Sequence, residues 1–243
     1  MTNGAVKNAK VSFGTASGMI SWKGQIVMVE MKVFPTREEW LQARAGRIGG
    51  SDASSILGMN PYMSNVELWQ IKTGQLVPED ISDKPYVKFG TEAEKHMREM
   101  FKLDFPEYQV FYEENNMFLN DKYPFAHASL DAWLIDQDGR KGVWECKTTN
   151  ILQSQQKEKW KDRIPDNYYI QLLHCLLVTE FDFAVMKARL RYEFNNDIYV
   201  QIKHYKLERA EVEADIKLLE SSEKRFWQQV QEGKRPGLIL PAI

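Results

Sequence analysis

Hydrophobic residues recur along this chain in two periods, and the alternation between the periods predicts the order of its elements. Spacing of three and four residues is typical of amphipathic helices, whereas alternation at every second residue is typical of strands. Helical spacing covers residues 36–45, 51–58, 64–74, 91–105, 151–163, 166–180 and about 211–232. Strand patterns cover residues 108–120, 125–135, 141–149, 183–192 and 197–207. This order predicts one α/β (α+β) domain with a mixed central sheet flanked by helices.

Polar residues stand where several of these helices should begin. Thr36 with Glu39, and Ser64 with Glu67, have the spacing of a capping box, in which each side chain bonds a free backbone N–H of the first turn. Ser51 has the position of an N-cap for the second helix. The first 32 residues are rich in small and polar types, and we expect an arm that is disordered in part, followed by a single domain over residues 33–243.

One predicted strand, residues 141–149, carries two opposite charges on a single face. Because side chains alternate across a strand, Glu145 and Lys147 point to the same side, and Cys146 points to the other. A salt bridge at a sheet edge is the plain interpretation of such a pair. A metal-dependent nuclease site is the alternative, and it requires a second carboxylate nearby.

Asp131 on the preceding strand can supply that carboxylate if the hairpin has the right register. A three-residue loop, 137–139, with its glycine in the left-handed conformation would pair Asp136 with Arg140. Asp131 would then lie directly opposite Glu145, with Cβ atoms roughly 5 Å apart. A two-residue turn at 138–139 would shift the register by one and separate the two carboxylates.

Two neighbouring carboxylates repel each other unless a cation lies between them. Their hard oxygen atoms suit Mg²⁺, and Mn²⁺ is expected to substitute for it. Asp131 and Glu145 are therefore the predicted metal ligands, and the backbone carbonyl of Cys146 can complete the set. Lys147 lies one pleat further along the strand, where it can hold or help to deprotonate the attacking water.

Composition limits the partners that this site can have. The 243 residues carry a formal net charge of −2, so any surface for nucleic-acid phosphates must be local. The basic run 157–163 is either a solvated helix face or such a surface. Two cysteines without metal-ligand spacing fit a reducing cytoplasm, and no apolar run reaches the roughly 20 residues of a membrane helix.

Asp131 followed by Glu145-Cys146-Lys147 resembles the motif of the PD-(D/E)XK nuclease superfamily, although Leu130 stands where that name has a proline. Three further stretches resemble the YqaJ family of viral recombinases, the lambda-exonuclease type of alkaline exonuclease. They are RAGRIGGSDASSILG, KFGTEAEKHMREMF and YYIQLLHCLLVTE, in the family's order. The resemblance covers residues from about 35 to the C-terminus and implies a restriction-endonuclease-like core.

The resemblance also implies roles for further residues. Glu92 matches a helix glutamate that faces the site and holds a metal-bound water or a second ion. Gln171 matches a glutamine that braces the lysine and the scissile strand. Arg44 and Ser51 match a pair that holds a 5′ phosphate, a role that the cap function of Ser51 does not exclude, and Arg47 could replace Arg44.

The family implies a Mg²⁺-dependent exonuclease that digests one strand of linear double-stranded DNA from its 5′ end and leaves 3′ single-stranded tails. It also implies a ring-shaped homotrimer, a single-strand annealing protein as partner, and recombination of phage or prophage DNA in the cytoplasm of a bacterial host. A restriction-like or RecB-type nuclease on the same core is the alternative, and a catalytically idle DNA-binding module is a third interpretation.

Overall fold

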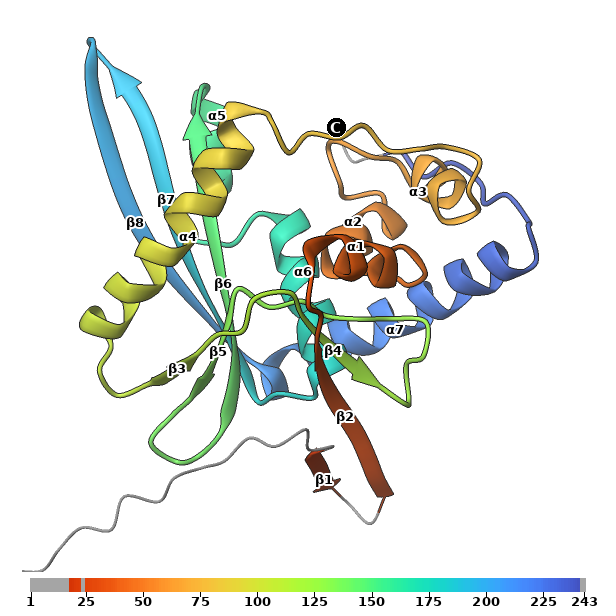
Figure 1. Ribbon diagram of the computed structural model, residues 1–243. Helices are drawn as coiled ribbons and strands as arrows, with labels where there is room; N and C mark the ends of the chain where they lie inside the picture. Colours follow the sequence, from red (N-terminus) through yellow and green to blue (C-terminus); the bar gives the residue numbers. More distant parts are fainter. Residues whose placement is uncertain (1–17, 23–24, 241–243) are drawn as a thin grey trace, which may run out of the picture.

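A five-stranded mixed sheet forms the centre of the protein in a computed structural model that describes residues 18–22 and 25–240 (Figure 1). The strand order is β3-β5-β6-β7-β8, and only β6 and β7 run parallel. The strands are β3 (Gln109–Phe111), β5 (Ala132–Ile135), β6 (Lys141–Ile151), β7 (Phe183–Phe194) and β8 (Asp197–Glu208). A second sheet of order β1-β2-β4 consists of β1 (Gly18–Trp22), β2 (Gln25–Val33) and β4 (Asn116–Asn120).

Helices cover both faces of the five-stranded sheet, as the sequence predicts for this fold class (Figure 1). They are α1 (Arg37–Ala45), α2 (Gly50–Ile56), α3 (Asn65–Lys72), α4 (Pro85–Asp104), α5 (Ser154–Lys159), α6 (Asp166–Thr179) and α7 (Arg209–Gln231). A small core joins α4 to one face of the sheet through Met97, Phe101, Trp144 and Phe183. The larger core lies on the other face, under α6, α2 and α7. The alternation within β6 therefore sends Trp144 and Cys146 toward α4, and Glu145 and Lys147 toward α6.

The β5–β6 hairpin has the register that the three-residue loop predicts. The N–H of Asp136 donates to the carbonyl of Arg140, and Gly139 has φ +77°, in the left-handed region that only glycine adopts freely. Ala132 pairs with Trp144, and the same register continued by one residue sets Asp131 opposite Glu145. This confirms the prediction that the turn brings the two carboxylates together.

Several predicted boundaries are wrong. Residues 108–120 form two strands in different sheets, β3 and β4, because Asn115 adopts φ +53° between them. Within the predicted strand 125–135, residues 132–135 form β5, whereas Ala126 and Ala128 make isolated bridges to Ile48 and Phe118. Helix α4 begins at Pro85 instead of near Thr91. Proline is favourable in a first helical turn, where its missing N–H costs nothing.

Part of the predicted N-terminal arm forms strands. Residues 18–22 and 25–33 form strands, and β2 pairs with β4 through residues 29–33, so strand structure crosses the predicted boundary after residue 32. Residues 1–17, which the prediction of disorder also covers, lie outside the described residues. No helix among the described residues is long and apolar enough to cross a membrane.

A buried ion pair ties α6 to α7. Nδ1 of His174 lies 2.7 Å from Oε1 of Glu223, and Nε2 lies 2.8 Å from the carbonyl oxygen of His127. A carbonyl can only accept, so Nε2 carries a proton, and the contact with Glu223 holds a second proton. Burial lowers the pKa of His174, but the charge and hydrogen bond of Glu223 and the carbonyl of His127 outweigh it and raise the pKa above 6.5. His174 and His127 are thus hydrogen-bonded core residues.

Glu223→Gln should lower the free energy of unfolding by about 3 kcal/mol, because it removes one partner of a buried charge pair. A raised pKa stabilises the folded state below the unfolded value of 6.5, and this contribution is lost as the pH rises through the folded pKa. The difference in free energy of unfolding between wild type and Glu223→Gln should therefore be largest below pH 6.5 and should become smaller at higher pH. Urea unfolding across a pH series measures it.

Glu220→Gln is the matched control, since Glu220 lies on the same helix and pairs with Lys224 toward solvent. Such a surface pair should cost less than about 1 kcal/mol. A loss for Glu223→Gln that is equal at every pH would contradict a charged His174.

Candidate active site

Asp131, Glu145 and Lys147 come together at the start of the β5–β6 hairpin. Asp131 lies immediately before β5, and its Oδ2 accepts the N–H of Cys146 at 2.9 Å. The Nζ of Lys147 lies 2.6 Å from Oε1 of Glu145. The strand that carries the two opposite charges therefore uses its backbone to hold a third charged group in place.

Gln171 on α6 meets the same carboxylate from the facing helix. Its Nε2 donates to Oε1 of Glu145 at 2.7 Å, so the glutamine braces the glutamate directly and the lysine only through it. Gly50 allows α2 to approach α6 at this point, and Gly49, the N-cap of α2, lies against His127. A Cβ on Gly50 would lie 3.1 Å from Cγ of Gln171, and one on Gly49 would lie 2.7 Å from the ring of His127.

The second oxygen of Glu145 is buried and has no hydrogen-bond partner. Lys147 and Gln171 both bind Oε1, which leaves Oε2 without a donor although Glu145 is only 2% exposed. A buried polar atom without a partner costs about 1–3 kcal/mol, and more if it is charged. Such an oxygen, close to Asp131, is a suitable ligand for a divalent cation.

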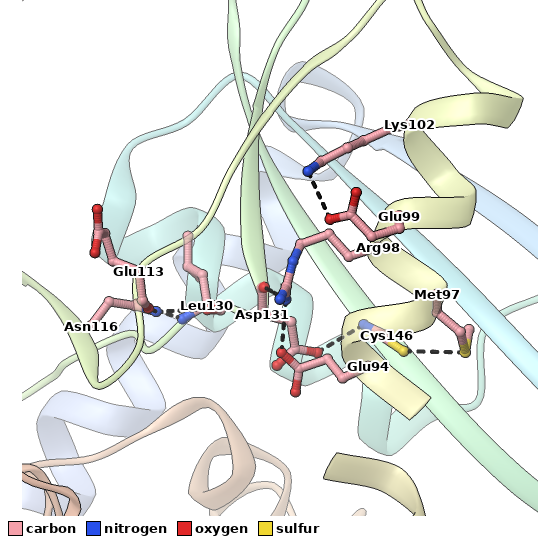
Figure 2. A network of polar contacts seen from close by, with 10 residues as sticks. All are labelled: Glu94, Met97, Arg98, Glu99, Lys102, Glu113, Asn116, Leu130, Asp131 and Cys146. Carbon is pink, nitrogen blue, oxygen red and sulfur yellow. Dashed lines mark hydrogen bonds and ion pairs between the residues drawn. The ribbon is translucent and has the colours of Figure 1, made fainter. Parts of the chain in front are cut away.

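Helix α4 adds a third carboxylate, and it is Glu94 rather than the predicted Glu92. Figure 2 shows Glu94, Arg98 and Asp131 directed toward one another. Nη1 of Arg98 donates to Oε1 of Glu94 at 3.2 Å and to the backbone carbonyl of Asp131 at 3.0 Å. Glu92 is exposed, because two residues on a helix turn a side chain by roughly 200° and so to the opposite face. The sequence signal that separates them is Arg98 four residues after Glu94.

Repulsion among the three carboxylates is visible in their pKa values. Burial and the charge of Asp131 raise the pKa of Glu145 to about 7 and that of Glu94 to about 8. Burial also raises the pKa of Asp131, against the opposing charges of Lys147 and Arg98. Burial alone would lower the pKa of Lys147, but Glu145 and Asp131 raise it above its ordinary value, so the lysine is charged. A site with this charge balance favours additional positive charge.

Asn116 fixes the chain just before Asp131, a role that was not predicted from the sequence. Its Oδ1 accepts the N–H of Leu130 at 2.9 Å, and its Nδ2 donates to the carbonyl of Leu130 at 2.8 Å (Figure 2). Together with the bond from Arg98 to the Asp131 carbonyl, these contacts hold the backbone on both sides of the Asp131 side chain. A buried asparagine inside an apolar strand is the signal that could have identified it.

Arg44 lies in the last turn of α1, and its charge acts on the pKa of Asp131. Its guanidinium lies 4.1 Å from the centroid of the Trp40 ring. Ser51 does not have the predicted N-cap position, because Gly49 is the N-cap and its N–H donates to Asp52 at 3.0 Å. Ser51 is instead exposed in the first turn of α2.

Within the described part of the chain, no group of three or more His, Cys, Asp or Glu side chains is placed so that it could hold a metal ion by itself. Mg²⁺ does not require such a group, since it keeps several waters and uses one or two carboxylates. Cys146, whose backbone carbonyl is the third predicted ligand, has a buried side chain against Met97 and a pKa raised by burial. The thiol is therefore a packing group.

Solved structures of known proteins share this fold. An alkaline exonuclease, LHK-Exo from Laribacter hongkongensis, superposes with a TM-score of 0.55 at 17% identity, covering 82% of this chain and 96% of that one. The complex of LHK-Exo with dAMP superposes with a TM-score of 0.53 at 16% identity, with the same coverage. At this level of identity the likeness establishes the fold.

Sequence relatives establish the family. The uncharacterized protein YqaJ of Bacillus subtilis (strain 168) is 32% identical over 208 residues, which are 84% of this chain and 59% of that protein. The chain thus spans about three fifths of the length of this relative. The family model of the YqaJ-like viral recombinase domain matches residues 39–182, which include Arg44, Asp131 and Gln171. Since this match extends over more than half of the sequence, the chain belongs to the YqaJ-like viral recombinase domain family.

Proposed function

We propose that this protein is a Mg²⁺-dependent exonuclease that degrades one strand of linear double-stranded DNA from the 5′ end and leaves 3′ single-stranded tails. The observation that carries the proposal is the cluster of Asp131, Glu94 and the buried Glu145 beside a charged lysine, with Oε2 of Glu145 left without a partner. The similar fold of LHK-Exo, an alkaline exonuclease crystallised with dAMP, supports an activity on DNA ends.

In this proposal Asp131 and Glu145 hold the metal with the Cys146 carbonyl, and Glu94 takes the role that the family resemblance implied for Glu92. When bound, Mg²⁺ supplies positive charge to a phosphodiester and makes hydroxide available at neutral pH. Lys147 orients the attacking water, Gln171 and Lys147 fix Glu145, and Arg98 fixes Glu94 and the Asp131 backbone. Each group is held before substrate arrives, so little reorganisation is needed.

A terminal 5′ phosphate is the proposed ligand of Arg44, with Ser51 as its second contact. The charge of Arg44 reaches Asp131, whose pKa it lowers, and its planar fork matches a phosphate. Ser51, in the exposed first turn of α2, can donate its hydroxyl to the same group. The homotrimeric ring, the annealing partner and the cytoplasm of a bacterial host belong to the same proposal and rest on the family.

Digestion of linear plasmid and of covalently closed plasmid, measured side by side, distinguishes an exonuclease from the alternative, an endonuclease on the same core. With Mg²⁺ present, only the linear form should be digested, and EDTA should stop the digestion. Cutting of the closed circle would instead establish an endonuclease on the same core.

Asp131→Ala and Glu145→Ala should each abolish digestion of linear duplex, because each removes a carboxylate that holds the metal. Binding of duplex ends should persist or tighten, since negative charge facing the phosphates is reduced. Degradation measured with Mg²⁺, alongside end binding, tests both statements. Asp138→Ala is the matched control, as Asp138 is exposed at the turn of the same hairpin. Near wild-type digestion by either site variant would move the metal elsewhere.

Lys147→Ala should lower the single-turnover rate by about 10², the scale of a positioned acid–base group. Affinity for Mn²⁺ should be kept, because both carboxylates remain. Lys141→Ala, on an exposed position of the same strand, should change neither quantity. A variant that loses metal binding but keeps its rate when saturated with metal would show that Lys147 organises the ligands instead.

Arg44→Ala should reduce the preference for 5′-phosphorylated over 5′-hydroxyl ends by about ten- to a hundred-fold. A hydrogen bond to a charged group contributes roughly 1.5–3 kcal/mol, which sets this range. The rate at which hydroxyl ends are digested should change little. In the presence of a DNA trap, the variant should degrade a shorter stretch of the strand before it dissociates. End-labelled duplexes of both types measure the effect. Arg47→Ala is the comparison, and loss of discrimination there but not in Arg44→Ala would assign the phosphate to Arg47.

A further inference from the structure

The β7–β8 hairpin carries an aromatic cavity on the same face of the sheet as the catalytic residues. Tyr192 and Tyr199 pair across the two strands with their rings stacked at 5.4 Å and 11°. A cavity of about 510 Å³ lies between these rings and the end of β6, and Phe194, Leu152 and Lys157 also line it. Figure 1 shows the hairpin standing clear of the helices at its tip.

The register places this cavity along the strand that carries the site. In the parallel pairing of β6 with β7, Tyr192 is the partner of Ile151, which lies on the same face of β6 as Glu145 and Lys147. Six residues of strand separate Ile151 from Glu145, a distance of roughly 20 Å. At the spacing of about 3.4 Å per nucleotide in one strand of duplex DNA, roughly six nucleotides cover this distance, so a DNA strand held at the site can reach the cavity.

The cavity exposes more apolar surface than a stable hairpin requires. Leu152 is 82% exposed and Phe194 is 62% exposed, while Tyr199 is 42% exposed. Contiguous exposed apolar surface on a monomer commonly marks a binding site. The volume also lies within the range of about 300–1,000 Å³ found for ligand pockets.

Charge indicates what binds there. The ammonium of Lys157 lies 4.1 Å from the centroid of the Tyr192 ring, and lysine is depleted from the cores of protein–protein interfaces. A second, open hollow of about 620 Å³ lies on the same segment and is lined by Lys159, Lys161 and Arg163 together with Glu158 and Asp162, so its charge is mixed, and Lys157 is the cation beside the aromatic rings. Aromatic rings beside a cation are the pattern that binds unpaired nucleic acid, because bases stack on the rings and the cation attracts phosphate.

We propose that this cavity, named here the hairpin subsite and lined by Leu152, Lys157, Tyr192, Phe194 and Tyr199, binds unpaired bases of single-stranded DNA. Duplex bases are stacked on each other and cannot use it, so the occupant is the strand that becomes unpaired next to the site. This inference rests on the proposed nuclease function for its biological sense, but the binding itself requires neither metal nor cleavage. Glu193 on the rim opposes the phosphates and limits the affinity.

Anisotropy of a short fluorescein-labelled oligothymidine, titrated with the full-length protein in EDTA, tests the proposal. Tyr199→Ala and Phe194→Ala should each weaken binding by about tenfold, the scale of one lost base–aromatic stack. Tyr199→Phe should bind like wild type, because stacking uses the ring and not the hydroxyl. Tyr62→Ala is the matched control, since Tyr62 is 86% exposed outside the cavity and should show no effect.

Two further measurements separate stacking from charge and from folding. An oligonucleotide of abasic sites should bind wild type and Tyr199→Ala equally, whereas Lys157→Gln should flatten the dependence of log affinity on log salt by about 0.7. Thermal unfolding of each variant verifies that the hairpin is folded. Both aromatic variants lie at exposed positions, so at least one should fold like wild type.

The proposal is overturned if both alanine variants bind oligothymidine like wild type, or if the abasic strand shows the same loss. It is also overturned if sedimentation shows self-association that Tyr199→Ala abolishes without changing DNA affinity, because the cavity would then hold a second copy of this chain. The nuclease proposal fails separately if the protein does not digest linear duplex with Mg²⁺. In that case binding of the oligonucleotide, and its loss in Tyr199→Ala, would still support the hairpin subsite.

Discussion

The register of one hairpin is the constraint on which the site depends. A slip of one residue between β5 and β6 would send Asp131 and Glu145 to opposite faces, because side chains alternate along a strand. Gly139 fixes the register through its positive φ, and the side chain of Asp136 reinforces it by accepting the N–H of Arg140 at 2.9 Å. A local turn thus determines the distance between two carboxylates that lie at the other end of the hairpin.

Helices from both faces of the sheet then complete what the hairpin begins. From one side α4 contributes Glu94 and Arg98, and from the other α6 contributes Gln171. Asp131 can face both because it lies just before β5, where the sheet no longer separates the two sides. Arg98 is buried and also lies 3.6 Å from the centroid of the Tyr112 ring, so its position is determined by packing as well as by charge. The site is therefore held by rigid elements, which is the condition for pre-organised chemistry.

What the sequence could predict was local, and what it could not predict was set by neighbours in space. The helix start at Ser64 and the turn at Gly139 follow from the chemistry of a few adjacent residues, and both are as predicted. Glu94 could not be distinguished from Glu92 by spacing alone, because the choice depends on the rotation of α4 against the sheet. Ser51 was misplaced for a similar reason, since the close contact of Gly49 with His127 determines where α2 begins.

Two buried ion pairs in this protein show why charge in a core does not by itself identify a site. The side chains of His174 and Glu223 are both 0% exposed, and one proton lies in the hydrogen bond between Nδ1 and Oε1. The pair is enclosed between α6 and α7. At the hairpin, the Lys147 side chain is 21% exposed, and Glu145 is accompanied by Asp131 and Glu94. The first pair is enclosed and ties two helices together, whereas the second belongs to a cluster of three carboxylates and has a route to solvent. A fold that served stability alone would gain by replacing one of these carboxylates with an apolar residue. The cluster of carboxylates is therefore better explained by the cation and the phosphate that we propose as its ligands than by the packing of the sheet.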